Sequence, residues 1–383
     1  MEESKYKVVV KTLRDEILGG KWLSPENPFP SERALVRRFG VSRPTIARAL
    51  QQLEGQGILL RRQGKGTFLT KAARRLGKAI GLIVPGIGYS EVYPPMCQEI
   101  SRLAQKHGMT LLFGDISSPN PQARAAQAMD LARKFAKENV SGVILQPIEF
   151  LKDSDRINRE LLSVFDKAGI SVVLIDNDVV PPPDRSSYDI VSFNCIDAGR
   201  RVALHLKKCG VHRVCFLMGE NWGYCLQSRL LGVKSVFGSA VSVADCDAKS
   251  LAAVRRLLMR RQKPDAFICR NDSIAIHLIV TLRRLGKRVP EDVEVVGFND
   301  LNYAQLVDPP LTTIHVPCAD IAQTAFRFLM ERIAGPSLPP RECYLPAPLV
   351  VRGSTKEPNA KRRKDRGRGR RRQPVETERN RKE

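Results

Sequence analysis

The sequence of 383 residues predicts an α/β multidomain protein, in which a small helical head precedes two open α/β lobes and a basic tail. Three observations lead to this fold class. Apolar residues at helical spacing, with glycines at the turns, fill residues 1–70. Apolar strands alternate with amphipathic helices over residues 79–355, and very few apolar residues follow Lys356. A chain of this length has room for two to three domains.

The head is predicted to contain three helices. The first has an apolar face that two glycines end: Tyr6, Val10, Leu13 and Ile17, then Gly19 and Gly20. Ser31 can cap a second helix, and Gly40 permits a tight turn after it. Ser42 can cap a third helix with the apolar face Ile46, Ala49, Leu50 and Leu53. Pro44 falls in the first turn of that helix, where a backbone N–H has no partner to lose.

A glycine-tipped hairpin follows the three helices. Residues 58–62 and 66–69 are strand-like and flank Gln63-Gly64-Lys65, a wing placed to lie over the minor groove or phosphates. A helix-turn-helix with such a wing typically places its last helix in the DNA major groove. Arg43, Thr45 and Arg48 lie near the start of that helix. Arg43 can form a bidentate contact with a guanine, which favours guanine over other bases by about 1–3 kcal/mol. The alternative is a three-helix packing unit with a solvated basic face.

These residues resemble the winged helix-turn-helix of GntR-family bacterial transcription regulators, from Tyr6 to Leu69. The resemblance is carried by Pro-Ser-Glu-Arg at 30–33, FGVSRPTI at 39–46 and QGKGTF at 63–68. It implies that Arg33, Arg43, Thr45, Gln63 and Gly64 contact DNA, and arabinose-repressor-like members add Lys5 and Glu32. Pro44 departs from the bulkier polar residue of some members, which bears on base preference there. The predicted DNA-binding set is Lys5, Glu32, Arg33, Ser42, Arg43, Thr45, Arg48, Gln63, Gly64 and Lys65.

Positive charge is concentrated at the two ends of the chain. Residues 1–78 hold 17 basic and 7 acidic side chains, and residues 356–383 hold 13 and 5. Of the net charge of +23, these segments account for +10 and +8, which leaves +5 for the 277 residues between them. This distribution predicts a polyanionic partner at the ends and an ordinary globular region in the middle.

Other function classes find little support in the sequence. The nine cysteines are scattered without a Cys-x-x-Cys pair, which is typical of buried thiols in a reducing compartment. The segment MEESKYK lacks the apolar core of a signal peptide, and no run approaches the ~20 apolar residues of a membrane span. We therefore expect a bacterial cytoplasmic protein with no membrane partner, located at the nucleoid when bound to DNA.

Catalytic and cofactor signatures are also missing from the sequence. The five histidines show neither metal spacing nor a partnered nucleophile, and Gly86-x-Gly88 has Glu91 where a dinucleotide fingerprint needs its third glycine. A carboxylate there repels pyrophosphate. The sequence therefore predicts no enzyme activity, no cofactor and no metal.

Beyond the head, eight apolar strands alternate with helical segments. The strands are predicted at 79–84, 109–113, 142–146, 171–175, 190–193, 213–218, 266–269 and 293–298. Helices are expected at segments such as 96–106, 124–137, 197–208 and 273–285. This alternation predicts parallel sheets covered by helices, and eight strands favour two open lobes over one.

Ligands in open α/β sheets bind beyond the carboxyl ends of the strands. The residues there carry hydroxyl, amide and carboxylate groups together with aromatic rings, which suits a small polyhydroxylated ligand such as a sugar. The alternative is that they are turn formers and helix caps. The residues predicted from this rule to contact ligand are Tyr89, Gln146, Asp176, Trp222, Asp272 and Asn299.

A second resemblance covers Lys78 to Arg352. The segments IGLIVP, GVILQP, VVLID, NCIDAGRRVALHL, PDAFICRND, VPEDVEVVGFND and PPLTTIHVP are similar to the effector domains of lactose-repressor-type regulators and of periplasmic sugar-binding proteins. This implies that Arg229 hydrogen-bonds sugar hydroxyls and that Asp272 contacts the ligand from the second lobe. Asn299 stands where that family usually has an aspartate, so the usual anionic acceptor is replaced by an amide.

Together, the two resemblances imply an arabinose-repressor-like architecture. The predicted divisions are a GntR-type winged helix-turn-helix at 1–70, a linker at 71–78, a lactose-repressor or periplasmic-binding-protein-like sensor of type I at 79–355, and a disordered basic tail at 356–383. The tail is either a polybasic arm for phosphates or a solvated end without a specific role.

The functional hypothesis is a sequence-specific repressor. A homodimer is expected to bind double-stranded operator DNA, and a small effector, a sugar or sugar derivative, is expected to control the affinity for that DNA. The alternatives are a solute-binding receptor or a sugar-modifying enzyme that carries a DNA-binding head.

Overall fold

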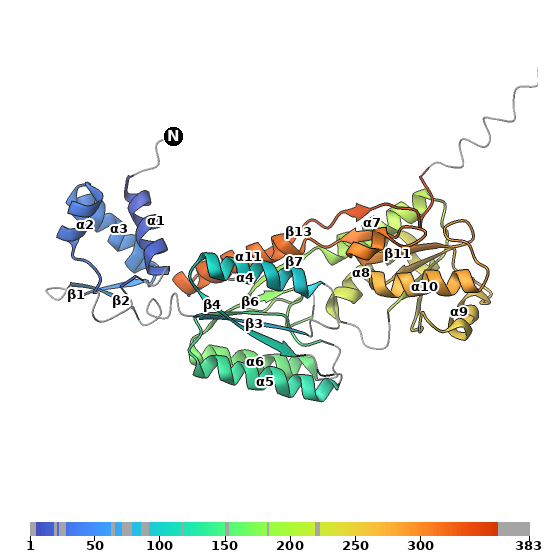
Figure 1. Ribbon diagram of the computed structural model, residues 1–383, viewed down its shortest axis with the longest axis horizontal. Helices are drawn as coiled ribbons and strands as arrows, with labels where there is room; N and C mark the ends of the chain where they lie inside the picture. The colour runs from blue at the N-terminus through green and yellow to red at the C-terminus, as the bar shows by residue number, and fades with distance from the viewer. Residues whose placement is uncertain are drawn as a thin grey trace, which may run out of the picture. The chain divides into compact units, whose positions relative to one another are not determined.

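A computed structural model describes residues 5–18, 21–22, 28–62, 66–70, 79–85, 92–116, 118, 120–149, 153–181, 184–218 and 223–358 (Figure 1). The chain divides into two compact units. Unit 1 comprises residues 1–195, 220–229 and 315–348, and unit 2 comprises residues 196–219, 230–314 and 349–383. Within the described residues, no helix is both long and apolar enough to cross a membrane.

The head consists of three helices and a two-stranded wing. In chain order these are α1 (Lys5–Leu18), α2 (Glu32–Phe39), α3 (Arg43–Gly55), β1 (Leu59–Arg62) and β2 (Gly66–Leu69). The predicted turn chemistry is confirmed at two positions: Ser31 Oγ accepts the Ala34 N–H (3.3 Å), and Gly40 has φ 61°. Ser42 occupies the predicted N-cap position of α3, but its hydroxyl makes no bond to the helix backbone and instead lies 2.8 Å from that of Thr45.

Apolar side chains from all three helices form the core of the head. Leu13, Ile17, Leu35, Ile46 and Leu50 are fully buried, and burial of each stabilises the fold by about 1.5–3 kcal/mol. The wing strands pair antiparallel, with Leu59 opposite Leu69 and Arg62 opposite Gly66. This packing fixes α3 and leaves the polar side chains at its start on the surface.

Unit 1 contains a six-stranded sheet between two helical layers. The strand order is β13 (Glu342–Leu345), β7 (Asp189–Phe193), β6 (Ser171–Ile175), β5 (Gly142–Leu145), β3 (Ala79–Pro85) and β4 (Thr110–Ile116), and these neighbours pair in parallel. Figure 1 shows α4 (Tyr93–Lys106) and α11 (Cys318–Ala334) on one face, and α5 (Pro121–Lys137) and α6 (Ser154–Ala168) on the other. The strand order reverses direction between β3 and β5, the switch point at which such sheets bind ligands.

The late elements α11 and β13 are tied to this sheet by a buried carboxylate. Asp189, at the start of β7, accepts hydrogen bonds from Arg332 (2.8 and 3.1 Å) and from the backbone and side chain of Arg341 (2.8–3.3 Å). Burial opposes the charge of Asp189, but the hydrogen bonds from Arg332 and Arg341 lower its pKa overall. Residues near 340 are thereby held beside residues near 190.

Unit 2 contains a similar six-stranded sheet. Its order is β14 (Leu349–Val350), β12 (Thr312–His315), β11 (Glu294–Asn299), β10 (Ala266–Cys269), β8 (Val214–Leu217) and β9 (Val241–Ala244), and the edge strand β14 pairs antiparallel with β12. The helices are α9 (Leu251–Leu258), α10 (Asp272–Arg284) and the greater part of α7 (Cys195–Lys208) and α8 (Tyr224–Phe237), whose first residues, Cys195 and 224–229, belong to unit 1. The 3₁₀ turns are η2 (Gly238–Ala240) and η3 (Asn302–Gln305). A core of buried residues joins α9 and α10 to the sheet. The switch point lies between β8 and β10.

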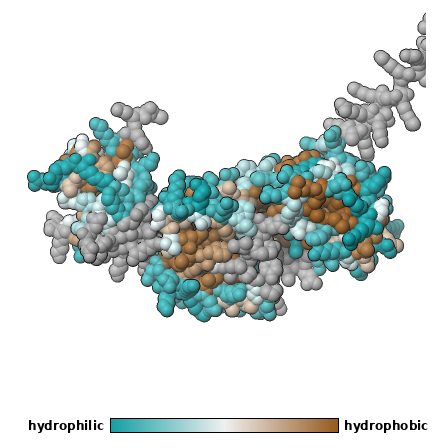
Figure 2. Space-filling view, in the orientation of Figure 1, coloured by the Kyte–Doolittle hydropathy of each residue, from teal (hydrophilic) through white to brown (hydrophobic). Residues whose placement is uncertain are grey.

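The predicted two α/β lobes and all eight predicted strands are therefore confirmed. Four further strands, β9, β12, β13 and β14, were not predicted. The linker 71–78 and residues 359–383 of the tail lie outside the described residues. Figure 2 shows that the visible face of each unit carries hydrophobic as well as hydrophilic side chains.

Candidate DNA interface and ligand site

The start of α3 presents exposed polar side chains. The side chain of Arg43 is 82% exposed, and Ser42 and Arg48 are exposed beside it, while Thr45 is half-buried. The guanidinium of Arg48 lies 4.3 Å from the ring centroid of Tyr6, a cation–π contact that positions it against α1. The exposed Arg43 can therefore extend into a groove, whereas Arg48 is held close to the body of the head.

Glu32 connects the start of α3 to the wing. Its carboxylate accepts from Arg43 Nε at 3.4 Å and from Arg61 on β1 at 2.5 Å. Exposed ion pairs of this kind contribute only about 0.2–1 kcal/mol, so phosphates can replace the carboxylate at little cost. Arg61 was missed by the sequence reasoning, although the Arg61-Arg62 pair in a strand next to the wing tip was the available signal.

The remaining predicted DNA contacts are distributed around the same surface. Lys5 lies on α1 and Arg33 in the first turn of α2, and both are exposed. The N-termini of α2 and α3 lie on this surface and add the positive ends of their helix dipoles, which favour phosphate. Gln63, Gly64 and Lys65 lie outside the described residues.

A cluster of buried polar side chains lies in unit 1 beyond the carboxyl ends of β5 and β6. Gln146 directly follows β5 and is 2% exposed, and Asp176 follows β6 in a turn with φ 72°. Tyr93 Oη donates to Asp176 Oδ2 at 3.4 Å. Arg229, on α8, is 7% exposed, and its guanidinium lies 5.4 Å from the ring centroid of Phe193. The structure thus brings together three of the predicted ligand residues.

Sequence reasoning missed a second carboxylate in this cluster. Gln146 Nε2 donates to Glu149 Oε2 at 3.4 Å. Burial and the neighbouring Asp176 raise the pKa of Glu149 to about 8, against the opposing effect of Arg229. Burial also raises the pKa of Asp176, while Arg229 and hydrogen bonds counteract it. Glu149 was missed because it stands three residues beyond the strand exit that the sequence rule considered.

Several atoms of the cluster lack hydrogen-bond partners. Among the described residues, Gln146 Oε1, Glu149 Oε1 and Asn177 Nδ2 are buried without one. A buried polar group left unpaired costs about 1–3 kcal/mol. Gln146 Oε1 can accept, Asn177 Nδ2 can donate, and the Glu149 carboxyl can donate while it is protonated. These groups suit a ligand that offers hydroxyl groups, which are both donors and acceptors.

The raised pKa of Glu149 predicts a pH-dependent stability. The folded pKa of about 8 exceeds the ordinary 4.5, so the stability that Glu149 contributes is complete below pH 4.5 and is lost as the pH rises through about 8. Glu149→Gln removes this loss. We expect the variant to exceed the wild type by about 2–4 kcal/mol in unfolding free energy at pH 9, with little difference at pH 5.

Denaturant unfolding at the two pH values measures this effect. Glu160→Gln is the matched control, because Glu160 is an exposed carboxylate of the same unit, paired with Arg156 on α6. The same pH dependence in the wild type and in Glu149→Gln would contradict the assignment of a buried, protonated Glu149.

In unit 2, Asp272 is held by hydrogen bonds, and Asn299 lies at the end of a strand. Asp272 is fully buried at the start of α10 and accepts from Thr313 Oγ1 (2.6 Å) and from the Leu301 N–H (2.8 Å). Burial raises its pKa to about 7. Asn299 and Asp300 have φ values of 116° and 57° at the end of β11, and Asp300 accepts from Arg352 at 2.6 Å. Both oxygens of Asp272 are thus bonded within unit 2, and its ligand contact stays a prediction.

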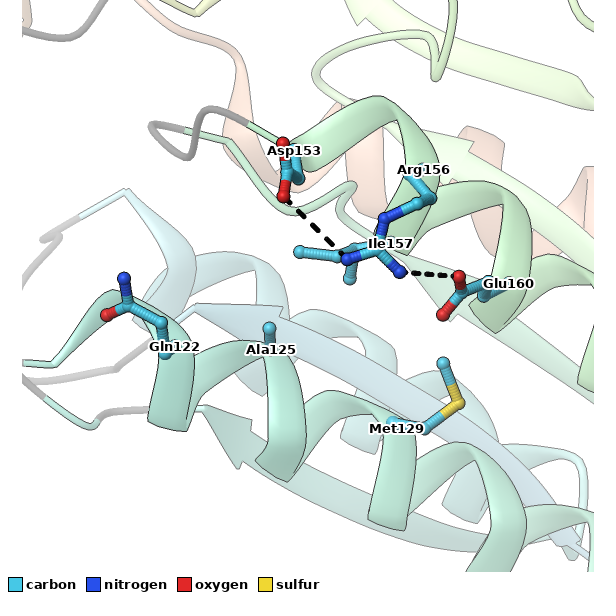
Figure 3. A pocket seen from close by; sticks show the side chains of 7 residues that line it. All are labelled: Gln122, Ala125, Met129, Asp153, Arg156, Ile157 and Glu160. Atoms are coloured by element: carbon cyan, nitrogen blue, oxygen red, sulfur yellow. Dashed lines mark hydrogen bonds and ion pairs between the residues drawn. The ribbon is translucent and has the colours of Figure 1, made fainter.

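The other predicted ligand residues, Tyr89 and Trp222, lie outside the described residues. A separate open cavity of about 360 Å³ lies between α5 and α6. Figure 3 shows Arg156 between Asp153 and Glu160 at its wall, and none of the predicted ligand residues line it. Within the part of the chain that the structure describes, no group of three or more His, Cys, Asp or Glu side chains could hold a metal ion.

Comparison with known sequences agrees with the geometry of both regions. Residues 5–69 match the gntR family of bacterial regulatory proteins, and residues 203–355 match a periplasmic binding protein-like domain. The chain is 26% identical over 367 residues to the arabinose metabolism transcriptional repressor of Geobacillus stearothermophilus. This alignment covers 92% of this chain and 98% of that protein. It is 29% identical over 296 residues to the repressor PurR of Vibrio vulnificus, covering 74% and 82%.

Solved structures share the fold. The complex of the transcriptional regulator CelR with cellobiose has a TM-score of 0.61 at 22% identity, over 88% of this chain and 94% of that chain. A LacI family regulator from Enterococcus faecium with bound ribose has a TM-score of 0.59 at 21% identity, over 72% and 98%. The relatives in sequence are transcriptional repressors.

Proposed function

We propose that this chain, which joins a gntR-family helix-turn-helix domain to a periplasmic-binding-protein-like domain, is a sequence-specific repressor whose operator affinity a small ligand controls. The observation that carries the proposal is the presence of both halves in one chain. Arg43 stands exposed at the start of α3, and a buried polar cluster with unpaired atoms lies at the carboxyl ends of β5 and β6. A DNA-reading surface and a ligand-binding cluster in the same chain favour ligand-controlled DNA binding.

The DNA contacts proposed are those of the head, Lys5, Glu32, Arg33, Ser42, Arg43, Thr45, Arg48 and the wing tip 63–65, to which Arg61 is added. A dimer would present two such heads to half-sites of a pseudo-palindromic operator, one helical turn or multiples apart. Leu231 on α8 and Ile196 on α7 are apolar side chains that are 57% and 48% exposed. The two helices pack closely at this point, because a Cβ at Gly232 would lie 2.0 Å from the Ile196 carbonyl oxygen. This apolar surface of unit 2 supports a second copy as the partner.

The effector proposed is a neutral carbohydrate. Arg229 donates and Asp176 and Gln146 accept, and the Asp176 carboxylate together with the buried neutral carboxyl of Glu149 offers no site for a phosphate charge. The solved structures of similar fold include one with cellobiose and one with ribose, which supports this class. Tyr89, Trp222, Asp272 and Asn299 remain proposed contacts from the other loops.

The proposal keeps the division into a head at 1–70, a linker at 71–78, a sensor at 79–355 and a tail at 356–383. It places the protein in the bacterial cytoplasm, at the nucleoid when bound to DNA. The protein binds and releases ligand without chemical turnover.

A thermal-shift screen of the full chain tests the ligand class. The screen would use neutral mono- and disaccharides beside their phosphates. A sugar at 100 times its Kd stabilises the folded protein by about 2.7 kcal/mol, which raises the Tm by a few degrees. We expect neutral sugars to give this shift and phosphosugars to give none. A shift with phosphosugars alone would contradict the proposed effector class.

The basic tail is expected to strengthen DNA binding through phosphates. Residues 359–383 hold 12 basic and 4 acidic side chains. Their deletion should make the slope of log K against log salt shallower by at least about 2 units, since each phosphate contact contributes about 0.9. The cut is placed after residue 358 because the Lys356 N–H donates to the buried Glu294 carboxylate at 3.2 Å.

The control for this deletion removes residues 374–383 only. That segment holds 3 basic and 3 acidic side chains, so its net charge is zero, whereas residues 359–373 hold 9 basic and 1 acidic. The control should keep the wild-type slope. An unchanged slope after the full deletion would favour a solvated tail without a DNA role.

A further inference from the structure

Two cysteines that lie 30 residues apart in sequence are brought together beside Arg229. Cys195 is the first residue of α7, and Cys225 lies in the first turn of α8. Both are 8% exposed, and their Sγ atoms are 2.7 Å apart. A disulfide bond is about 2.0 Å long, so the two sulfur atoms need to approach by less than ~1 Å to become bonded. The sequence predicted isolated thiols, because it contains no Cys-x-x-Cys motif that would indicate such a pair.

The chain passes between the two units next to this pair. One segment of unit 1 ends at Cys195, and another runs from residue 220 to Arg229 and includes Cys225. From Ile196 and from Leu230 onwards, the same two helices belong to unit 2. The chain passes from unit 1 into unit 2 after Cys195 and again after Arg229. A bond between the two sulfurs would therefore link two of these crossing segments.

The surroundings of the two sulfurs influence their reactivity in opposite directions. Burial alone would lower the pKa of Arg229, but the nearby sulfurs of Cys225 and Cys195 raise it overall, which places the guanidinium close to both. A neighbouring cation stabilises a thiolate. The hydrogen bond with Cys195 and burial nevertheless raise the pKa of Cys225 well above its ordinary value. Oxidation should therefore proceed faster as the pH rises.

We propose that Cys195 and Cys225 form a redox-reactive dithiol, which a hydroperoxide closes to an intramolecular disulfide that ties the start of α7 to the first turn of α8. In the first step, one thiol attacks the peroxide, so that an S–O bond forms, the O–O bond breaks, and hydrogen peroxide yields a sulfenic acid and water. The second thiol then attacks that sulfur, which forms the S–S bond and releases a second water. Two thiols lose two electrons, and the peroxide gains them.

Peptide mapping of the full chain tests the bond directly. The protein is treated with hydrogen peroxide at pH 7 and pH 9, alkylated with N-ethylmaleimide and digested with trypsin. We expect the number of alkylated cysteines to fall from nine to seven. Residues 186–200 should be linked to residues 214–229, with fragment ions assigning the link to Cys225 and not to Cys215. The link should form faster at pH 9 and be reversed by dithiothreitol.

Single variants supply the controls. Cys225→Ser should lose the link, and Cys343→Ser, which removes a thiol from β13, should keep it. The linked wild type should also melt about 5 °C higher than the reduced protein, since a disulfide restricts the unfolded chain. Over-oxidation of either cysteine to sulfinic acid, a link between other cysteines, or equal thiol loss in Cys225→Ser would overturn the proposal. The mapping of the wild type needs no variant to fold.

The consequence for regulation rests on the proposed function. A disulfide at this junction restrains the segments that an effector would have to move, so the oxidised protein should respond at least about 5-fold less to sugar in operator binding than the reduced protein. An undiminished response in the linked protein would contradict this regulatory role. Failure of the proposed function would look different, because the reduced protein would then show no response to sugar.

Discussion

Replacing Arg229 with methionine is expected to abolish the response to effector while leaving operator binding intact. Arg229 is 7% exposed, lies beside Asp176 and Glu149, and is the cation of the unit 1 cluster. Loss of two hydrogen bonds from a charged donor lowers sugar affinity on the order of 100-fold. The measurement is sugar titration followed by thermal shift and by release of operator DNA.

The Arg229→Met variant also leaves a buried carboxylate without its cation. Breaking such a pair costs about 3–5 kcal/mol of stability, so poor folding could imitate lost binding. The double variant Asp176→Asn/Arg229→Met removes both charges and should recover most of the Tm. It should still fail to bind sugar. Normal sugar affinity in the double variant would show that the cluster is not the effector site.

Replacing Arg43 with alanine should reduce discrimination between operator and random DNA. The side chain is 82% exposed at the start of α3, and its only described bond there is the weak one to Glu32. A bidentate contact to guanine contributes about 1–3 kcal/mol, which is roughly 5- to 150-fold in the ratio of specific to non-specific affinity. Competition binding with an operator obtained by in vitro selection measures this ratio.

Arg37→Ala is the matched control for Arg43. Arg37 is an exposed arginine in the last turn of α2 and lies outside the predicted DNA-binding set. Arg37→Ala removes the same charge as Arg43→Ala, so it should change the affinities for operator and for random DNA by similar factors and leave their ratio unchanged. If Arg43→Ala behaved in the same way as Arg37→Ala, Arg43 would be a phosphate contact and not a base-reading residue.

The sequence predicted the head well because its local signals agree with one another. Ser31, Gly40 and Pro44 each occupy a position that their backbone chemistry favours, and the apolar residues of α3 fall on one face. In the lobes, long runs of β-branched residues marked the central strands. The edge strands β9 and β13 escaped prediction because they are short and half-exposed, with the sequences VSVA and ECYL. Their hydrophobic signal is correspondingly weak.

Long-range features could be predicted only in part. The strand-exit rule found Gln146 and Asp176, but it gave no reason to expect Glu149 or Tyr93 beside them. It also included Asp272, whose oxygens are bonded to Thr313 and Leu301. The Cys195 and Cys225 pair and the return of β13 to the sheet of unit 1 depend on contacts between residues far apart in sequence. Such contacts leave no local pattern.

The most direct test of ligand-controlled repression is the affinity of the full chain for its selected operator, measured with and without a sugar that raises the Tm. Fluorescence anisotropy at fixed salt gives both dissociation constants. We expect them to differ by about 5- to 150-fold, which corresponds to a coupling of about 1–3 kcal/mol. Equal operator affinity with and without every sugar that binds the protein would contradict the account.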